Sequence, residues 1–93
     1  MPRVIFAPRA RRWLHAELAD VSPAAVGRLR ERIGTTRRLL SEYPQIGIRA
    51  TPAGARRLVV PPYVVIYRER EGRVEIMDIR HSRQAERPIP DEA

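Results

Sequence analysis

Apolar residues change their spacing along the chain, and these changes divide it into elements. Residues 4–6 form a short β-branched and aromatic run that ends at Ala7-Pro8, which predicts a strand followed by a break. From Arg9 the period becomes three to four residues, which predicts a helix with one apolar face. That face consists of Ala10, Trp13, Leu14, Leu18 and Val21.

A second helix is predicted directly after the first. Ser22-Pro23 separates the two, because serine caps a helix and proline fits its first turn without losing a hydrogen bond. The helix should end before Pro44, since the residue that precedes a proline avoids the helical conformation. A link this short predicts an antiparallel helical hairpin. The apolar face of the second helix consists of Val26, Leu29, Ile33, Thr36, Leu39, Leu40 and Tyr43.

The chain after Pro44 has the alternation and the turn signals of a sheet. Residues 45–47 are predicted as a loop, 48–51 as a short strand and 52–54 as a turn. Strands at 55–60, 63–68 and 73–79 should form a meander, with a turn at 69–72. Counting only the three strands of the meander after the helices, the prediction is an α+β fold in the order β-α-α-β-β-β, in which an N-terminal strand precedes a hairpin that packs on an antiparallel sheet.

Length and composition limit what this fold can do. Ninety-three residues predict one domain, residues 1–93, in which about 84–93 form a frayed tail. The 18 basic residues are all arginine, and the net charge of +7 favours nucleic acid, an anionic membrane surface or an acidic protein as the partner. The lack of lysine excludes a lysine base or Schiff base, and the lack of cysteine excludes disulfides and thiol chemistry.

Metal and cofactor sites are not predicted. His15 and His81 are far apart in the sequence without carboxylates at ligand spacing, and His15 is interpreted as an ordinary surface or half-buried histidine. The glycines are dispersed and form no phosphate-binding loop. The longest apolar run, residues 64–66, is too short for a membrane span and the first residues do not resemble a signal peptide, so we expect a cytoplasmic protein.

Candidate site residues gather near the predicted strand ends. Depending on strand order and direction, a meander could bring these strand ends toward one region. The residues are Arg56, Arg57, Tyr63, Arg80, His81 and Arg83. Arginine clamps phosphate, tyrosine stacks on a base and histidine exchanges a proton, so these are the parts of a metal-independent ribonuclease. The alternative is a solvated sheet end with the tyrosine in the core. Trp13 either packs between hairpin and sheet or serves as an exposed partner-binding anchor.

In this order and spacing, the chain resembles toxins of the ParE/RelE superfamily over nearly its whole length. The matching segments follow the pattern of a strand ending in proline, a helix ending in Leu-x-x-x-Pro-x-x-Gly, then Arg-x-Leu or its equivalent, Tyr-x-Ile-x-Tyr-Arg and His-x-Arg. They are Val4 to Pro8, Leu40 through Pro44 to Gly47, Arg57 to Val59, Tyr63 to Arg68, and Ile79 to Arg83.

The resemblance implies a toxin of a type II toxin–antitoxin pair. Its partner would be a ParD-like antitoxin whose acidic, amphipathic C-terminal segment wraps the toxin. ParE-like members poison DNA gyrase without chemistry of their own, whereas RelE-like members cleave mRNA in the ribosomal A site. This chain has no lysine in the sheet and carries Ser82 after His81, so we predict the ParE type. The partner-binding candidates are Trp13, Arg56, Arg57, Tyr63, Arg80, His81 and Arg83.

Two alternatives remain open. A ribosome-dependent mRNA endonuclease would use Arg57 and His81 as its catalytic residues. A noncatalytic nucleic-acid-binding module would bind duplex or single strands directly, with a steep dependence on salt. In either case the sequence predicts no metal and no cofactor.

Overall fold

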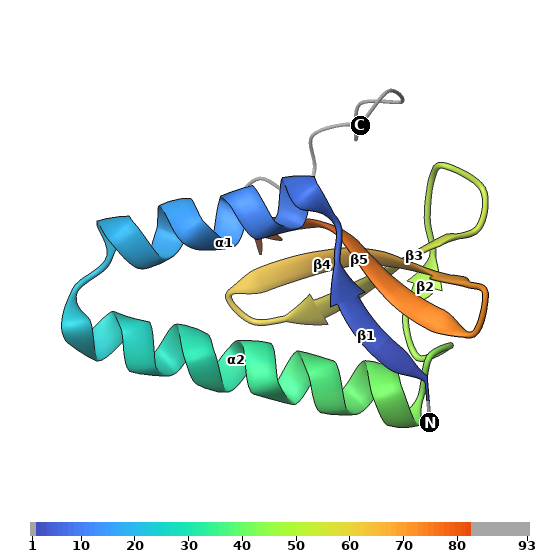
Figure 1. The fold of residues 1–93 in the computed structure, drawn as a ribbon, viewed down its shortest axis with the longest axis horizontal. Coiled ribbons are helices and arrows are strands. Elements are labelled where there is room, and N and C mark those ends of the chain that lie inside the picture. Colours follow the sequence, from blue (N-terminus) through green and yellow to red (C-terminus); the bar gives the residue numbers. More distant parts are fainter. Residues whose placement is uncertain (1, 83–93) are drawn as a thin grey trace.

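The computed structural model describes residues 2–82, so the predicted tail at 84–93 and the candidate Arg83 lie outside the described residues. The elements follow the predicted order of a strand, two helices and a series of strands (Figure 1). They are β1 (Arg3–Phe6), α1 (Pro8–Asp20), α2 (Pro23–Glu42), β2 (Ile48–Arg49), β3 (Ala55–Val60), β4 (Tyr63–Arg70) and β5 (Arg73–His81).

The two helices form the predicted hairpin, which lies over one face of the sheet (Figure 1). The Ser22 hydroxyl accepts a hydrogen bond from the Ala25 N–H at 3.3 Å, as expected of a helix cap. The apolar face predicted for α2 extends one residue too far. Tyr43 is 58% exposed, because the backbone leaves the helix at this residue, directly before Pro44.

The sheet is mixed, with the strand order β1-β5-β4-β3-β2. The β3–β4–β5 meander is antiparallel as predicted, and β1 joins its far edge in parallel to β5. Arg37 of α2 secures this strand: its guanidinium donates to the Val4 carbonyl oxygen at 3.2 Å and lies 4.7 Å from the centre of the Phe6 ring. The first strand therefore contacts both the last strand and the second helix.

Two strands extend beyond their predicted ends. The prediction of a turn over 69–72 is wrong, because β4 continues to Arg70 and the turn is Glu71-Gly72 alone. Both turn residues have positive φ, 53° and 74°, as a two-residue hairpin turn of type I′ requires. β5 continues past Ile79, so His81 lies within the strand opposite Tyr63. β2, in contrast, is shorter than predicted and contains only Ile48 and Arg49.

Alternation along the central strand β4 produces two apolar layers. Val65 and Tyr67 face the helices and belong to the main core, which also includes Leu40 of α2. Val64 and Ile66 face the other side and form a smaller cluster with Ala55. All of these side chains are buried, so β4 contributes to both layers.

Tyr67 fixes the loop between α2 and β2. Its side chain is fully buried, and its hydroxyl oxygen accepts a hydrogen bond from the buried Gly47 N–H at 2.9 Å. A Cβ atom at Gly47 would lie 2.8 Å from both the Arg57 carbonyl oxygen and the Tyr67 ring. Only glycine therefore fits where this loop crosses β3.

We predict that Tyr67→Phe destabilises the fold, because it leaves the buried Gly47 N–H without an acceptor. The free energy of unfolding should fall by about 1–3 kcal/mol, measured by denaturant titration. Tyr43→Phe is the matched control, since that side chain is exposed and its loss of a hydroxyl should change stability by less than about 0.5 kcal/mol. Equal stabilities of the two variants would contradict this role of Tyr67.

Candidate functional site

Three ring side chains from three elements meet at the end of the sheet beneath α1. Trp13 of α1, Tyr63 of β4 and His81 of β5 form this aromatic cluster. The ring centres of Trp13 and Tyr63 are 5.5 Å apart, those of Trp13 and His81 5.9 Å, and those of Tyr63 and His81 5.3 Å. The Trp13 ring meets Tyr63 edge to face, the arrangement that the charge distribution of aromatic rings favours. Antiparallel pairing of Tyr63 with His81 brings the two strand residues together.

Charged groups from both helices surround the aromatic cluster. Glu17, one turn after Trp13, places its carboxylate 3.3 Å from the His81 Nε2 atom, and this contact is an ion pair when the imidazole is protonated. Burial raises the pKa of the Tyr63 hydroxyl, and the negative charge of Glu17 raises it further. Arg28 and Arg32 of α2 act in the opposite direction and lower that pKa. The hairpin thus contributes charge of both signs to this end of the sheet.

Trp13 is half-buried and packs against the main core. The structure thus shows the packing between hairpin and sheet that was one of the two interpretations of this residue. His81 keeps 41% of its side chain exposed. A partly exposed set of rings with polar atoms at their edges is typical of protein-binding surfaces, where such residues combine apolar contact with hydrogen bonding.

Arg56 and Arg57 do not join the aromatic cluster, so the meander does not bring all the candidates together. Both lie near the start of β3, and antiparallel pairing places the end of that strand, Val60, beside Tyr63. Arg56 donates instead to the carbonyl oxygens of Gln45 and Gly47, at 3.3 and 2.8 Å. It therefore binds the backbone of the loop before β2.

Arg57 and His81 lie on opposite faces of the sheet. Arg57 is paired with Ile66, which belongs to the layer away from the helices, whereas His81 is paired with Tyr63 on the helix side. They are two strands and three residue positions apart, which corresponds to roughly 14 Å at standard sheet spacing. Their side chains therefore do not converge on one reacting atom.

Arg80 binds a carboxylate within its own strand. Its Nε atom lies 2.8 Å from Asp78 Oδ2, and both side chains are largely buried. Asp78 also accepts the Ile79 N–H at 3.0 Å and lies 3.7 Å from Arg9 Nε at the start of α1. This carboxylate links α1 to β5, and Arg80 contributes to the structure through it.

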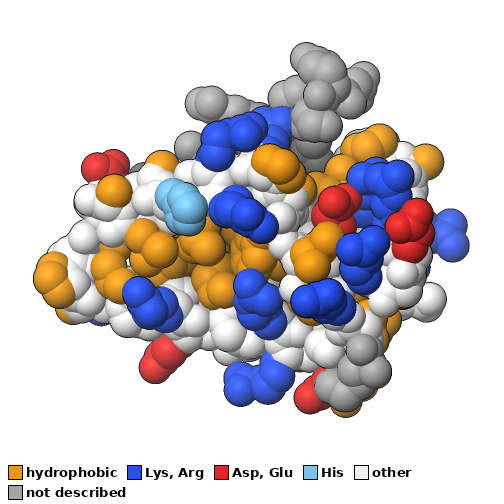
Figure 2. All heavy atoms as spheres, viewed as in Figure 1, with side chains coloured by type: hydrophobic (Ala, Val, Ile, Leu, Met, Phe, Trp, Pro, Cys, Tyr) orange, Lys and Arg blue, Asp and Glu red, His pale blue; other side chains and the backbone are white. Residues whose placement is uncertain are grey.

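A strip of hydrophobic side chains is visible between the two helices, with basic side chains along its borders (Figure 2). The helices are close together at the short link that joins them and diverge toward the sheet (Figure 1). We call it the hairpin strip. The fold leaves several apolar residues of the hairpin only partly buried, among them Leu14, Leu18, Val21, Val26 and Ile33.

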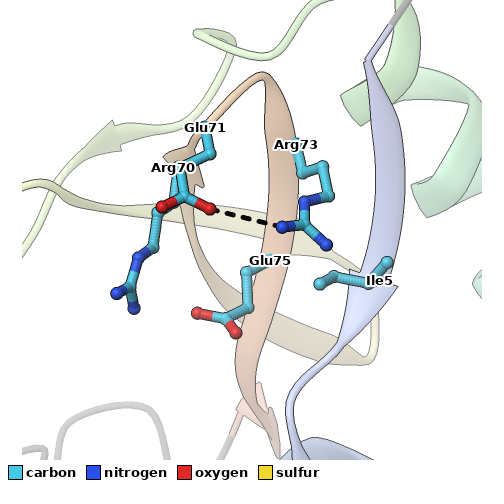
Figure 3. Close-up of a pocket in the computed structure, with 5 residues that line it drawn as sticks. All are labelled: Ile5, Arg70, Glu71, Arg73 and Glu75. Atoms are coloured by element: carbon cyan, nitrogen blue, oxygen red, sulfur yellow. Dashed lines mark hydrogen bonds and ion pairs between the residues drawn. The ribbon is translucent and has the colours of Figure 1, made fainter.

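A hollow of about 170 Å³ lies beside the β4–β5 turn and is lined by equal numbers of positive and negative side chains. Arg70, Arg73, Glu71 and Glu75 line it together with Ile5 (Figure 3). Arg73 donates to Glu71 at 3.3 Å, while Glu75 is paired with Arg68 at 2.8 Å. The carboxylates neutralise the arginines, so this hollow has no excess charge with which to attract an anion.

Within residues 2–82, no group of three histidine, aspartate or glutamate side chains is placed to hold a metal ion. None of the helices in that range is long and apolar enough to cross a membrane.

Comparison with known proteins gives the family. Residues 4–86 match the family described as the ParE toxin of the type II toxin–antitoxin system parDE. This chain belongs to the ParE toxin family. Toxin RelE2 of Caulobacter vibrioides is 38% identical over 80 residues, which cover 75% of this chain and 91% of that protein. A structure of the chromosomal ParDE toxin–antitoxin system from P. aeruginosa shares the fold of this ParE-family toxin, with a TM-score of 0.71 and 17% identity over 87% of this chain and 96% of the other.

Sequence reasoning missed two carboxylates of the ParE-family toxin. Asp78 interrupts the apolar run of β5, and a charged residue within such a run is the signal that would have identified a buried ion pair. Glu17 lies four residues after Trp13 on α1, and this spacing would have placed the two on one helix face. Neither signal reveals the partner on the other element, because His81 is distant from Glu17 in the sequence and Arg9 is distant from Asp78.

We predict that Glu17→Gln lowers the pKa of the Tyr63 hydroxyl, because it removes a negative charge that stabilises the protonated form. NMR or absorbance titration of the phenol measures the change. Glu31→Gln on α2 is the control, since Glu31 is not among the groups that shift this pKa. An unchanged Tyr63 titration in the Glu17→Gln variant would contradict the geometry of the site.

Because the pKa of the Tyr63 hydroxyl is raised, the stability of the fold should depend on pH in the alkaline range. The folded toxin retains the Tyr63 proton above pH of about 10, where the unfolded chain releases it. Because the folded state then binds more protons, the free energy of unfolding should fall as the pH rises from this value through the raised pKa.

Proposed function

We propose that this ParE-family toxin inhibits DNA gyrase by binding it in the cytoplasm, and that a ParD-like antitoxin neutralises it. The observation that carries the noncatalytic part is the separation of Arg57 and His81 on opposite faces of the sheet. Cleavage of RNA at a 2′-hydroxyl needs a base, an acid and a cation around one phosphate. Arg56 and Arg80, the neighbouring cations, are bound to the loop backbone and to Asp78.

Membership of the ParE toxin family supports gyrase as the proposed target. A toxin that stalls an enzyme needs a binding surface and no reacting groups of its own. The aromatic cluster, in which three half-exposed or half-buried rings meet, offers such a surface at the end of the sheet.

The antitoxin partner is supported by charge and shape. The chain carries a net charge of +7, and basic side chains border the hairpin strip (Figure 2). An amphipathic acidic segment would cover the apolar residues of the strip and place its carboxylates near these arginines. Burial of Leu18, Val21 and Val26, which the toxin alone covers only in part, would contribute favourable free energy.

Purified gyrase tests the proposal. The toxin should block supercoiling of relaxed plasmid and cause cleaved gyrase–DNA complexes to accumulate, and prior mixing with the antitoxin should restore supercoiling. Toxin denatured and left unfolded serves as the control for nonspecific binding of a basic chain to DNA. Full supercoiling in the presence of excess folded toxin would rule out gyrase as the target.

The alternative function is a ribosome-dependent mRNA endonuclease. It is favoured by the 38% identity to a protein named RelE2 and by the presence of Arg57 and His81. The noncatalytic function remains the better supported of the two, because these two residues would need to act on the same phosphate from opposite faces.

A further inference from the structure

A hollow of about 320 Å³ lies between the start of α1 and the strands β4 and β5. Pro8 in the first turn of α1, Ile66 of β4 and Met77 of β5 form its apolar part. Ile66 is buried and Met77 is half-buried, and both belong to the apolar layer on the face of the sheet away from the helices. The volume lies within the range of roughly 300–1,000 Å³ that is typical of small-molecule sites.

Three arginines and two carboxylates also line this hollow, so its positive groups outnumber its negative ones. Arg68 donates to Glu75 from both Nε and Nη2 at 2.8 Å, and both distances are to the Oε1 atom. Arg9 Nε lies 3.7 Å from the Oδ1 atom of Asp78, which is too far for a hydrogen bond. Arg12 is exposed and forms no ion pair within residues 2–82. Arg9 and Arg12 therefore remain able to bind an anionic group.

The start of α1 adds to the positive potential of these arginines. The helix begins at Pro8 without a side-chain cap, and its first turn contains no acidic residue. The N–H groups of a first helical turn lack partners within the helix, and together with the helix dipole they favour an anion. Because Ala7 and Pro8 line the same hollow as Arg9 and Arg12, this potential acts on whatever the hollow contains.

A hydrogen-bond acceptor lies at the other end of the apolar surface. Both contacts of Arg68 are to Oε1 of Glu75, so the Oε2 atom has no partner among the described residues. Along β5, Met77 lies between Glu75 and Asp78, the carboxylate nearest to Arg9. Carboxylate oxygens accept from hydroxyl and amine groups, and a methionine side chain adapts its shape to a flat ring. The hollow thus places an acceptor, an apolar surface and free cations in sequence.

We propose that this hollow binds a free nucleotide. The base would lie on Ile66 and Met77, and Arg9 and Arg12 would hold the phosphate. Guanidinium groups favour phosphate because they donate two parallel hydrogen bonds to its oxygens. The Oε2 atom of Glu75 would accept from a sugar hydroxyl or a base amine. An inorganic anion would contact only the cations, whereas a nucleotide contacts all parts of the hollow. This inference depends neither on the target of the toxin nor on its antitoxin.

Isothermal titration calorimetry of the folded toxin tests the site. The probes are the common nucleoside 5′-monophosphates, the matching nucleosides and inorganic phosphate. At least one nucleotide should bind about tenfold or more tightly than both its nucleoside and inorganic phosphate, because only the nucleotide contacts the apolar surface and the arginines together. If every nucleotide binds no more tightly than inorganic phosphate, the proposal is overturned.

Arg12→Gln and Arg11→Gln form a matched pair of variants on α1, since each removes the charge of an exposed arginine. Of these two residues, Arg12 lines the hollow and Arg11 does not. Arg12→Gln should weaken nucleotide binding about tenfold or more, through loss of a charge-assisted hydrogen bond. Arg11→Gln should weaken it less than about twofold, because salt screens exposed charges that make no contact. Equal weakening by both variants would mean that only net charge matters and would overturn the site.

NMR of the Met77 methyl group tests the position of the base. Its resonance should shift when the nucleotide binds but not when inorganic phosphate is added. The ring resonances of Tyr43, which lines a separate hollow, should stay unchanged with either probe. Nucleotide binding that leaves the Met77 methyl resonance unshifted would overturn the assignment to this hollow. Binding of a short oligonucleotide but of no free nucleotide would overturn the choice of occupant.

Discussion

The parallel pairing of β1 with β5 is the constraint on which the rest of the structure depends. It joins the first strand to the last, with Val4 beside Val74 and Phe6 beside Ile76. Because α1 follows β1 after a single residue, this pairing places α1 across the sheet and Trp13 above the strand ends. Arg37 of α2 contacts Val4 and Phe6 of the same strand. The position of β1 therefore determines the positions of both helices.

Much of this fold could be predicted from spacing alone. The spacing of apolar positions at three to four residues located both helices, and Ser22-Pro23 located the break between them, because these signals are local. The strand ends were less accurate. Glu69, Arg70 and His81 are polar and gave no apolar signal, yet their pairing with β5 or β4 extends the strands. The parallel partner of β1 is a long-range property that no local pattern carries.

Only part of the candidate site could be predicted, because strand direction and register decide which side chains meet. Tyr63 and His81 come together because they occupy the same register position of an antiparallel pair. Arg57 does not join them, because alternation turns it to the other face of the sheet. The residue types were recognisable in the sequence, but their faces depend on register.

The claim that this toxin acts by binding is tested most directly by the integrity of mRNA in a translation reaction that contains ribosomes and purified toxin. The separation of Arg57 from His81 predicts that mRNA in the ribosomal A site stays intact even with excess folded toxin. Cleavage at the A site that disappears in both folded Arg57→Ala and folded His81→Ala variants would contradict the account.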